Sequence, residues 1–336
     1  MKYRPLGTTG INASAISFGA GPIPALLTGD DRSVQRETVN AAIAAGINWF
    51  DTAATYAAGR SEESLGATLH DLGASQSVHV ASKVRLMPEH LGDIAASVRD
   101  SVAGSLRRLK LERITLLQLH NSITPKTGDE PTSLTPAHVL SPGGVLDAMS
   151  RLQRDGLVEH LGLTGIGNPT SLAEVIAAGP WATIQTPYNL LNPTAGEDIE
   201  QLDGQSNYGN IIARCAERRM GVFAIRVLAG GALVGQPPSV HTLTTKFFPL
   251  ALYEHDRRTA AAIEQALPPG VNLKEVAVRF ALSHPHVTSA IVGFSDPQQV
   301  REVVRLAAAG PLAAEMLESV SKARARNASP ESIRSA

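Results

Sequence analysis

The feature that most restricts the fold is a regular alternation of short apolar runs with longer amphipathic stretches. Eight strand-like runs occur, at residues 15–18, 47–51, 78–83, 114–120, 158–164, 183–186, 221–226 and 289–293. Helix-like stretches follow them, at residues 32–45, 62–72, 91–109, 144–154, 171–178, 209–219, 273–282 and 297–308. Strands that alternate with helices form a parallel sheet, and eight is the number at which such a sheet closes on itself. The sequence therefore predicts an α/β fold, the (β/α)8 barrel.

An open, doubly wound sheet is the competing fold. The segment Gly19-Ala20-Gly21-Pro22 resembles the start of a dinucleotide-binding fingerprint. Pro22 and Pro24, however, stand where that fingerprint requires a helix to begin. The closed barrel is therefore favoured.

The composition is typical of a globular protein. The chain has 336 residues, of which 43% are hydrophobic and 18% charged, so a large core is available and one barrel accounts for the length. The formal net charge of −1 argues against nucleic acid or an anionic membrane as the main partner. We expect a single barrel over residues 1–325 and a frayed C-terminal tail over residues 326–336.

Other features predict a soluble, cytoplasmic protein without a metal site. The opening residues lack the apolar core of a secretory signal, and no window approaches the roughly 18 unbroken apolar residues of a membrane span. The single Cys215 excludes an intrachain disulfide, and its helix-like surroundings indicate an inert, packed thiol. His284 and His286 have no third ligand nearby, which favours a helix-ending turn over a metal site. We expect a monomer or weak homo-oligomer whose partners are small molecules.

The connections between the predicted strands indicate where a site would lie. Residues 3–19 read as a hairpin with a polar turn, which we expect to plug the bottom of the barrel. Three connections are long, at residues 121–143, 190–208 and 229–256, and each follows a strand. In a barrel all three would lie on the C-terminal face, where catalysis occurs. This agreement points to an enzyme.

Four polar residues end, or follow closely, three successive predicted strands. Asp51 ends the second strand with Tyr56 five residues later, Lys83 ends the third, and His120 ends the fourth. Each follows an apolar run, so all four are expected at one rim of the barrel, facing one pocket. An ion pair between Asp51 and Lys83 with no catalytic role is the alternative for that pair alone.

Such a group can perform proton transfer at a carbonyl. When a carbonyl accepts hydride, its oxygen develops negative charge and needs a proton, which Tyr56 can supply. A tyrosine is a weak acid with an ordinary pKa of about 10. The ammonium of Lys83 would stabilise the tyrosinate, Asp51 would hold the lysine, and His120 could donate a hydrogen bond to the substrate oxygen. In the reverse direction the tyrosinate would be the base for alcohol oxidation.

These residues resemble the aldo-keto reductase family, and the resemblance covers nearly the whole chain. The opening YRPLGTTGINAS, the segment INWFDTAATYAAGRSEESLG and the strand LLQLHN each look like a family motif. The resemblance implies that Tyr56 is the general acid/base, that Lys83 and Asp51 modulate it, and that His120 orients the substrate. It also implies a nicotinamide cofactor, NADP(H) or NAD(H).

The cofactor residues resemble the family less closely. Gln185, in IQTPYNLLN, matches the glutamine that binds the nicotinamide carboxamide, and Thr164 stands where a serine hydroxyl is usual. Arg226 occupies another serine position, where it could reach a diphosphate or an acidic substrate, or be paired within the rim. Asn168 could bind the carboxamide or be a loop residue without a ligand.

The segment AIVGFSDPQQVREVV resembles the part of the family that binds the adenosine half of the cofactor. The positions implied there are Gly293, Ser295, Asp296, Gln299 and Glu302. A helix N-terminus can hold a phosphate through its free N–H groups. Asp296 would repel a 2′-phosphate or bind a free ribose, whereas the family favours NADP. The choice between NADP and NAD therefore stays open.

Two functions remain. The first is an NAD(P)-dependent oxidoreductase acting on an aldehyde, a ketone or a sugar-type alcohol. The region around Arg226 and the GLTG turn looks nearer the sugar- and galactose-dehydrogenase branch. The second is a cofactor-binding regulatory subunit with slow turnover, because potassium-channel β subunits share the resemblance.

Overall fold

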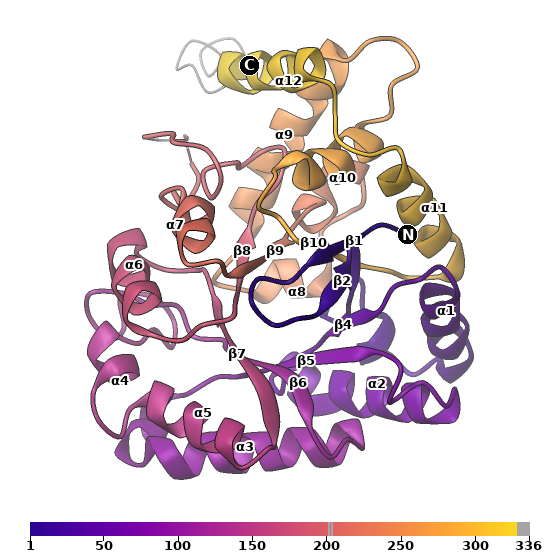
Figure 1. The fold of residues 1–336 in the computed structure, drawn as a ribbon. Helices are drawn as coiled ribbons and strands as arrows, with labels where there is room; N and C mark the ends of the chain where they lie inside the picture. Colours follow the sequence, from indigo (N-terminus) through magenta and orange to yellow (C-terminus); the bar gives the residue numbers. More distant parts are fainter. Residues whose placement is uncertain (201, 203, 328–336) are drawn as a thin grey trace.

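The computed structural model describes residues 1–200, 202 and 204–327, and its centre is a closed barrel of eight parallel strands (Figure 1). The strands are β3 (Ile16–Gly19), β4 (Trp49–Asp51), β5 (His79–Val84), β6 (Ile114–Leu119), β7 (Val158–Thr164), β8 (Thr183–Pro187), β9 (Gly221–Ile225) and β10 (Ser289–Gly293). They pair in chain order, and β10 closes the ring by pairing with β3, with Ala290 opposite Ile16. The predicted (β/α)8 barrel is confirmed, and each strand lies within two residues of its predicted bounds.

The helices surround the barrel (Figure 1). Those that match a predicted stretch are α1 (Arg32–Ala44), α2 (Arg60–Asp71), α3 (Ile94–Leu109), α5 (Val145–Arg154), α6 (Pro169–Ala178), α7 (Ile211–Glu217), α10 (Leu273–Ser283) and α11 (Pro297–Ala308). Four were not predicted: α4 (Pro136–Leu140), α8 (Val240–Thr244), α9 (Leu250–Ala266) and α12 (Ala314–Asn327). Short 3-10 turns occur at η1 (Leu26–Thr28), η2 (Tyr56–Gly59), η3 (Pro88–Gly92) and η4 (Ala229–Val234). The end of the chain expected to fray lies mostly at residues 328–336, outside the described residues, and α12 continues to Asn327.

The interior of the barrel is apolar at its lower end. The side chains of Trp49, Ala81, Leu116 and Phe223 form one buried cluster, with the Trp49 and Phe223 ring centroids 4.9 Å apart. Successive side chains of a strand point to opposite faces, so the residue two positions further along each strand points inward one level higher. The sequence places a polar group at that upper level in several strands, and this change from apolar to polar positions the site.

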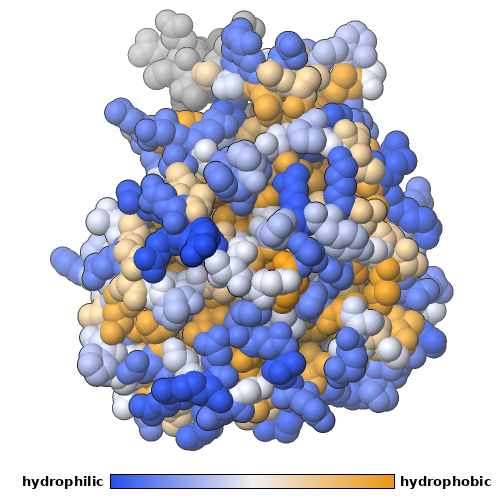
Figure 2. Space-filling view, viewed as in Figure 1, coloured by the Kyte–Doolittle hydropathy of each residue, from blue (hydrophilic) through white to orange (hydrophobic). Residues whose placement is uncertain are grey.

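The N-terminal hairpin closes the lower end of the barrel. Strands β1 (Tyr3–Pro5) and β2 (Asn12–Ser14) pair antiparallel, and Leu6 in their turn joins the apolar cluster inside the barrel. A Cβ atom at Gly221, the first residue of β9, would stand 2.4 Å from a Leu6 methyl group, so a larger residue there would displace Leu6. The Arg4 guanidinium donates hydrogen bonds to the carbonyl oxygens of Leu282 and Val287, just before β10. On the face of the molecule that carries this hairpin, hydrophilic residues are interspersed with small hydrophobic patches (Figure 2).

The long connections follow strands as expected, but they are more regular than the sequence indicated. The connection over residues 229–256 contains η4, α8 and the start of α9, none of which was predicted from the sequence. Residues of this connection and of the one at 121–143 line the main cavity, whereas none from 190–208 does so among the described residues. The Cys215 side chain is fully buried, and burial raises the pKa of its thiol to about 12, as expected for an inert group.

Candidate active site

A cavity of about 820 Å³ opens at the carboxyl ends of the barrel strands. Its floor carries the polar upper level of the barrel interior: Asp51 stands two residues beyond Trp49, and Lys83 two beyond Ala81. The wall that faces this floor consists of η4 and the segment from α8 to α9. The cavity therefore lies where sites occur in barrels of this type.

An ion pair forms the floor of the cavity. The Lys83 ammonium lies 2.5 Å from Asp51 Oδ1, donates to the Thr52 carbonyl at 2.8 Å, and lies 3.3 Å from the Tyr56 hydroxyl. The second oxygen of Asp51 accepts hydrogen bonds from the amides of Gln118, at 3.3 Å, and Gln185. Both charged side chains are almost fully buried. Burial alone lowers the pKa of Lys83, but the charges of Asp51 and Tyr56 outweigh it and the pKa is raised, so the lysine stays charged.

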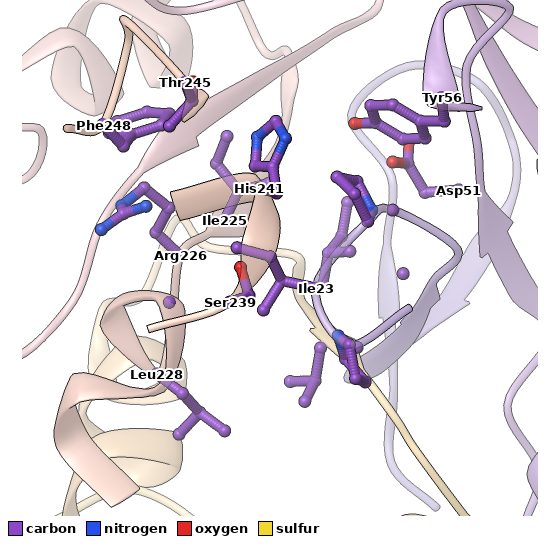
Figure 3. A pocket seen from close by; sticks show the side chains of 18 of the residues that line it. Ile23, Asp51, Tyr56, Ile225, Arg226, Leu228, Ser239, His241, Thr245 and Phe248 are labelled. Atoms are coloured by element: carbon purple, nitrogen blue, oxygen red, sulfur yellow. The ribbon is translucent and has the colours of Figure 1, made fainter. Parts of the chain in front are cut away.

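Tyr56 projects its hydroxyl into the cavity (Figure 3). It begins the short turn η2, in which Ala57 and Ala58 both adopt positive φ angles, 48° and 54°. Two consecutive non-glycine residues in this region are strained, and such strain persists only where the surroundings enforce it. The Lys83 ammonium also lies 4.8 Å from the centroid of the Tyr56 ring. The turn therefore holds the phenol directly beside the ammonium.

The segment GRSEESLG, residues 59–66, holds this turn in its conformation. The Ser61 hydroxyl donates to the Ala20 carbonyl at 2.6 Å and contacts Thr52, which ties the start of α2 to the barrel rim. Glu62 is fully buried, and it accepts hydrogen bonds from Ser82 of β5 and from Arg108 of α3 at 2.7 Å. This motif is structural, because it fixes the turn that carries the tyrosine.

His120 lies across the cavity floor from the tyrosine. Its ring centroid is 5.7 Å from that of Tyr56, edge to face, and its Nδ1 lies 3.4 Å from the Thr55 hydroxyl. Burial, followed by the charges of Arg85 and Lys83, lowers the pKa of His120 well below its usual value. The imidazole is therefore neutral, and when Nδ1 accepts from Thr55 the proton is on Nε2, ready to donate. The structure thus brings together the four residues that the sequence indicated.

Two of the predicted cofactor residues lie at the inner end of the cavity. Thr164, at the end of β7, is buried, and its hydroxyl has no hydrogen-bond partner among the described residues. Gln185 of β8 lies beside it in the cavity wall and donates its amide to Asp51. Ile225, at the end of β9, presents an apolar surface to the same space (Figure 3). An unsatisfied buried hydroxyl beside an apolar face fits the carboxamide and ring of a nicotinamide.

The other end of the cavity reaches α11. The predicted residues that line it are Gly293, Ser295, Gln299 and Glu302. Asp296 does not line the cavity: its carboxylate caps α11 by accepting from the Gln299 N–H at 2.9 Å. Lys274, which the sequence analysis did not select, lines this end and forms an ion pair with Glu302 at 2.8 Å. A cation is therefore present at this end of the cavity.

Arg226 is paired within the rim. Its guanidinium lies 3.6 Å from the carboxylate of Asp256 and 4.1 Å from the ring centroid of Phe248 (Figure 3). Burial lowers the pKa of Arg226, and it raises the pKa of Asp256 to about 7. Of the two interpretations that the sequence left open, this geometry supports the paired arginine. Asn168 is a helix cap that accepts from the Ser171 N–H, and it is not part of the cavity wall.

Arg85, which was not predicted from the sequence, also lines the cavity near Tyr56 and His120. A signal for it was present: Arg85 stands two residues beyond Lys83, so an extended chain directs both side chains to the same side. Within residues 1–200, 202 and 204–327, no group of three or more His, Cys, Asp or Glu side chains could hold a metal ion. In the same residues no helix combines the length and the apolar character that crossing a bilayer requires.

The fold and the site together define a (β/α)8-barrel protein with a tyrosine, a lysine, an aspartate and a histidine gathered at the C-terminal ends of its strands. Residues 15–325 match the sequence profile of the Aldo/keto reductase family. The chain therefore belongs to this family of oxidoreductases.

Individual relatives agree with this assignment. L-galactose dehydrogenase of Arabidopsis thaliana is 27% identical over 309 residues, covering 90% of this chain and 87% of the relative. A probable voltage-gated potassium channel subunit beta of Oryza sativa subsp. japonica is 26% identical over 324 residues, covering 90% of each chain. The fold matches an aldo-keto reductase from Bacillus halodurans, solved in its holo form, with a TM-score of 0.72, 23% identity and 96% of each chain covered.

Proposed function

We propose that this protein is an NAD(P)-dependent oxidoreductase that transfers hydride between a nicotinamide cofactor and an aldehyde, a ketone or a sugar-type alcohol, with Tyr56 as the general acid/base. The observation that carries the proposal is the chain of contacts from Asp51 through Lys83, at 2.5 Å, to the Tyr56 hydroxyl, at 3.3 Å. It ends in a cavity, beside the neutral imidazole of His120.

In the reductive direction the residues act on the substrate oxygen. His120 donates a hydrogen bond to the carbonyl oxygen and orients it, and the Tyr56 hydroxyl donates its proton to that oxygen as negative charge develops there. The Lys83 ammonium stabilises the tyrosinate that remains, and Asp51 holds the ammonium in place. In oxidation the tyrosinate takes the alcohol proton back. A nicotinamide bound beside them supplies the hydride in one direction and accepts it in the other.

Several residues of the chain fit the cofactor. We infer that Thr164 and Gln185 bind the carboxamide and that Ile225 covers the ring. Gly293, Ser295, Gln299 and Glu302 would surround the adenosine half, as they line the far end of the cavity. Arg226 is already paired with Asp256, so it would support the wall rather than bind the diphosphate directly. The acidic cap Asp296 favours NAD(H), whereas Lys274 favours NADP(H).

The test is Tyr56→Phe, which removes the proton donor and leaves the ring. We expect the rate of hydride transfer to ordinary carbonyls to fall by a factor of about 10² to 10⁴, the usual contribution of general acid–base catalysis. Binding of NADPH and NADH, followed by cofactor fluorescence, should be retained. Tyr3→Phe, in the hairpin at the opposite end of the barrel, is the matched control. Near-normal turnover by Tyr56→Phe would contradict the mechanism.

A regulatory subunit with slow turnover is the second candidate, and the similarity to the rice β subunit favours it. The two candidates differ in kinetics. An enzyme turns over repeatedly at rates near the common range of about 1–10³ per second, whereas a sensor subunit gives one slow turnover for each bound cofactor. Pre-steady-state and steady-state cofactor oxidation, measured on one sample, separates them. Sugar-type alcohols are the first substrates to test, because a similar chain is an L-galactose dehydrogenase.

A further inference from the structure

The cavity holds one half-buried cation, Arg85, that has no role in the proposed chemistry. Arg85 follows the last residue of β5 and lines the cavity together with Tyr56 and His120. It is close enough to His120 that its charge contributes to lowering the pKa of the imidazole. The presence of a cation so near Tyr56, the proposed proton donor, therefore requires an explanation.

Three other cations that line the cavity are each paired with a carboxylate. Lys83 pairs with Asp51 at 2.5 Å, Arg226 with Asp256 at 3.6 Å, and Lys274 with Glu302 at 2.8 Å. Arg85, by contrast, forms no ion pair with any residue that the structure describes, and its Nε is buried without a hydrogen-bond partner there.

What surrounds Arg85 adds no compensating charge. The guanidinium lies 5.4 Å from the ring centroid of Phe247, which belongs to the opposite wall. The same wall carries His241, whose pKa is lowered by burial and then by the charges of Arg226 and Arg85, and the exposed Lys246. This part of the cavity therefore has an excess of positive charge. The buried Nε of Arg85 has no hydrogen-bond partner among the described residues, which is costly, and a planar guanidinium matches a carboxylate or a phosphate.

The cofactor does not account for this arginine. Arg85 follows β5, and in the ring order β10-β3-β4-β5-β6-β7-β8-β9 this strand lies on the opposite side from β9 and β10. The far end of the cavity, which fits the adenosine half, is made by residues that follow β10. The excess charge instead faces the space above Tyr56 and His120, where the substrate carbonyl would lie.

We propose that the substrate carries an anionic oxygen group, a carboxylate or a phosphate, and that Arg85 binds it beneath Phe247 while the carbonyl or alcohol contacts Tyr56 and His120. This proposal rests on the proposed function and narrows its substrate class. Arg85 is thus a specificity-determining residue. The buried Nε and the terminal nitrogens supply the donors, and the anion supplies the charge that the cavity lacks.

The kinetic experiment compares matched substrates. We would measure kcat/KM for 4-oxobutanoate against butanal, and for glyceraldehyde 3-phosphate against glyceraldehyde, with the wild type and with Arg85→Gln. The wild type should prefer the anionic member of at least one pair by tenfold or more, and the pair concerned distinguishes carboxylate from phosphate. In Arg85→Gln that preference should fall by a factor of about 10 to 100, the range for charge-assisted hydrogen bonds. Arg85→Lys keeps the charge but loses the planar fork, so it should recover only part of the preference.

Arg36→Gln is the matched control, because it makes the same substitution at an exposed position of α1 that does not line the cavity. Its preference ratio should change less than threefold. The midpoint of thermal unfolding of Arg85→Gln should equal or exceed that of the wild type, because the substitution removes a half-buried charge that has no carboxylate partner. A lower midpoint, or an equal loss with the anionic and neutral substrates, would assign Arg85 a structural role and overturn the proposal.

A binding measurement separates this proposal from the proposed function. Titration calorimetry of the cofactor-loaded protein with succinate, and with neutral succinamide, together with glycerol 3-phosphate against glycerol, requires no turnover. Binding of an anion by the wild type, and not by Arg85→Gln, would support the anion site even if no carbonyl were reduced. Equal binding of anionic and neutral compounds would overturn the anion site, whatever the outcome of the turnover assays.

Discussion

Replacing the two members of the buried ion pair, separately and together, distinguishes a catalytic pair from a structural one. The Lys83 ammonium and the Asp51 carboxylate lie 2.5 Å apart with side chains 1% and 5% exposed. At an effective dielectric constant of about 20, two unit charges at that separation attract each other by about 7 kcal/mol. Much of this attraction only offsets the cost of removing both charges from water.

Breaking the pair exposes that cost. Lys83→Met leaves the carboxylate of Asp51 buried with only amide donors. Asp51→Asn leaves the ammonium buried with neutral oxygen acceptors and no negative charge to balance it. Each single variant should lose about 3–5 kcal/mol of unfolding free energy. The double variant buries no unpaired charge and should lie within about 2 kcal/mol of the wild type. Urea denaturation followed by circular dichroism measures all four proteins.

Among the wild type, the two single variants and the double variant, the loss of activity should not parallel the loss of unfolding free energy. The double variant should fold yet have kcat/KM reduced at least a hundredfold, because the tyrosinate no longer has its ammonium. If the double variant is as active as the wild type, the pair is structural and Tyr56 does not depend on it. If the losses of stability in the two single variants simply add in the double variant, the two charges are not coupled and the energetic reasoning is wrong.

Three further expectations concern other parts of the molecule. Asp296→Arg should raise the affinity for NADPH relative to NADH about tenfold, which corresponds to about 1.4 kcal/mol. Asp296→Asn, which keeps the cap of α11, should raise this affinity ratio less. An unchanged ratio in fluorescence titrations would place the ribose 2′-hydroxyl elsewhere. Because burial lowers the pKa of His120 well below its unfolded value of about 6.5, the folded state resists a proton that the unfolded chain accepts. The wild type should therefore lose about 2 kcal/mol more unfolding free energy between pH 7 and pH 5 than His120→Gln does, and equal losses would contradict the assigned environment. Gly66→Ala should destabilise by about 1–3 kcal/mol, despite the better helix propensity of alanine, because its Cβ would stand 2.5 Å from the backbone of Leu109; an increase in thermal stability would show that α2 and α3 can move apart.

The barrel strands were predictable because they are buried on both faces. A parallel strand with helices outside and a core inside has a sequence that is a short unbroken apolar run, and the turn residues on either side mark where it begins and ends. The 17-residue helix α9 was missed for the opposite reason. Its buried positions include Asp256, Thr259 and Ala260, and no side chain caps its N-terminus after Pro249. Neither its periodicity nor its start could be seen in the chain.

The residues of the candidate site also differ in whether the sequence alone could predict them. Asp51, Lys83 and His120 were found because each lies at the end of an apolar strand or directly follows one, so that all three are placed at the same rim of the barrel. The roles of Asp256 and Lys274 depend on which residue from a distant element faces them, Arg226 in one case and Glu302 in the other. A single sequence carries no signal for such pairings. Asp296 was selected for a contact with the cofactor, but its carboxylate caps α11 and does not line the cavity.

The closure of the ring between its first and last strands also has a consequence during synthesis. Strand β10 pairs with β3 across more than 270 residues of chain, and Arg4 reaches the carbonyl that precedes β10 by two residues. Until that last strand leaves the ribosome, the half-made sheet has two open parallel edges, each a template for pairing with a neighbouring chain. A nascent polypeptide interrupted anywhere before residue 289 would keep those edges. Chaperone protection should thus matter most in the final stage of translation, after most of the barrel already exists.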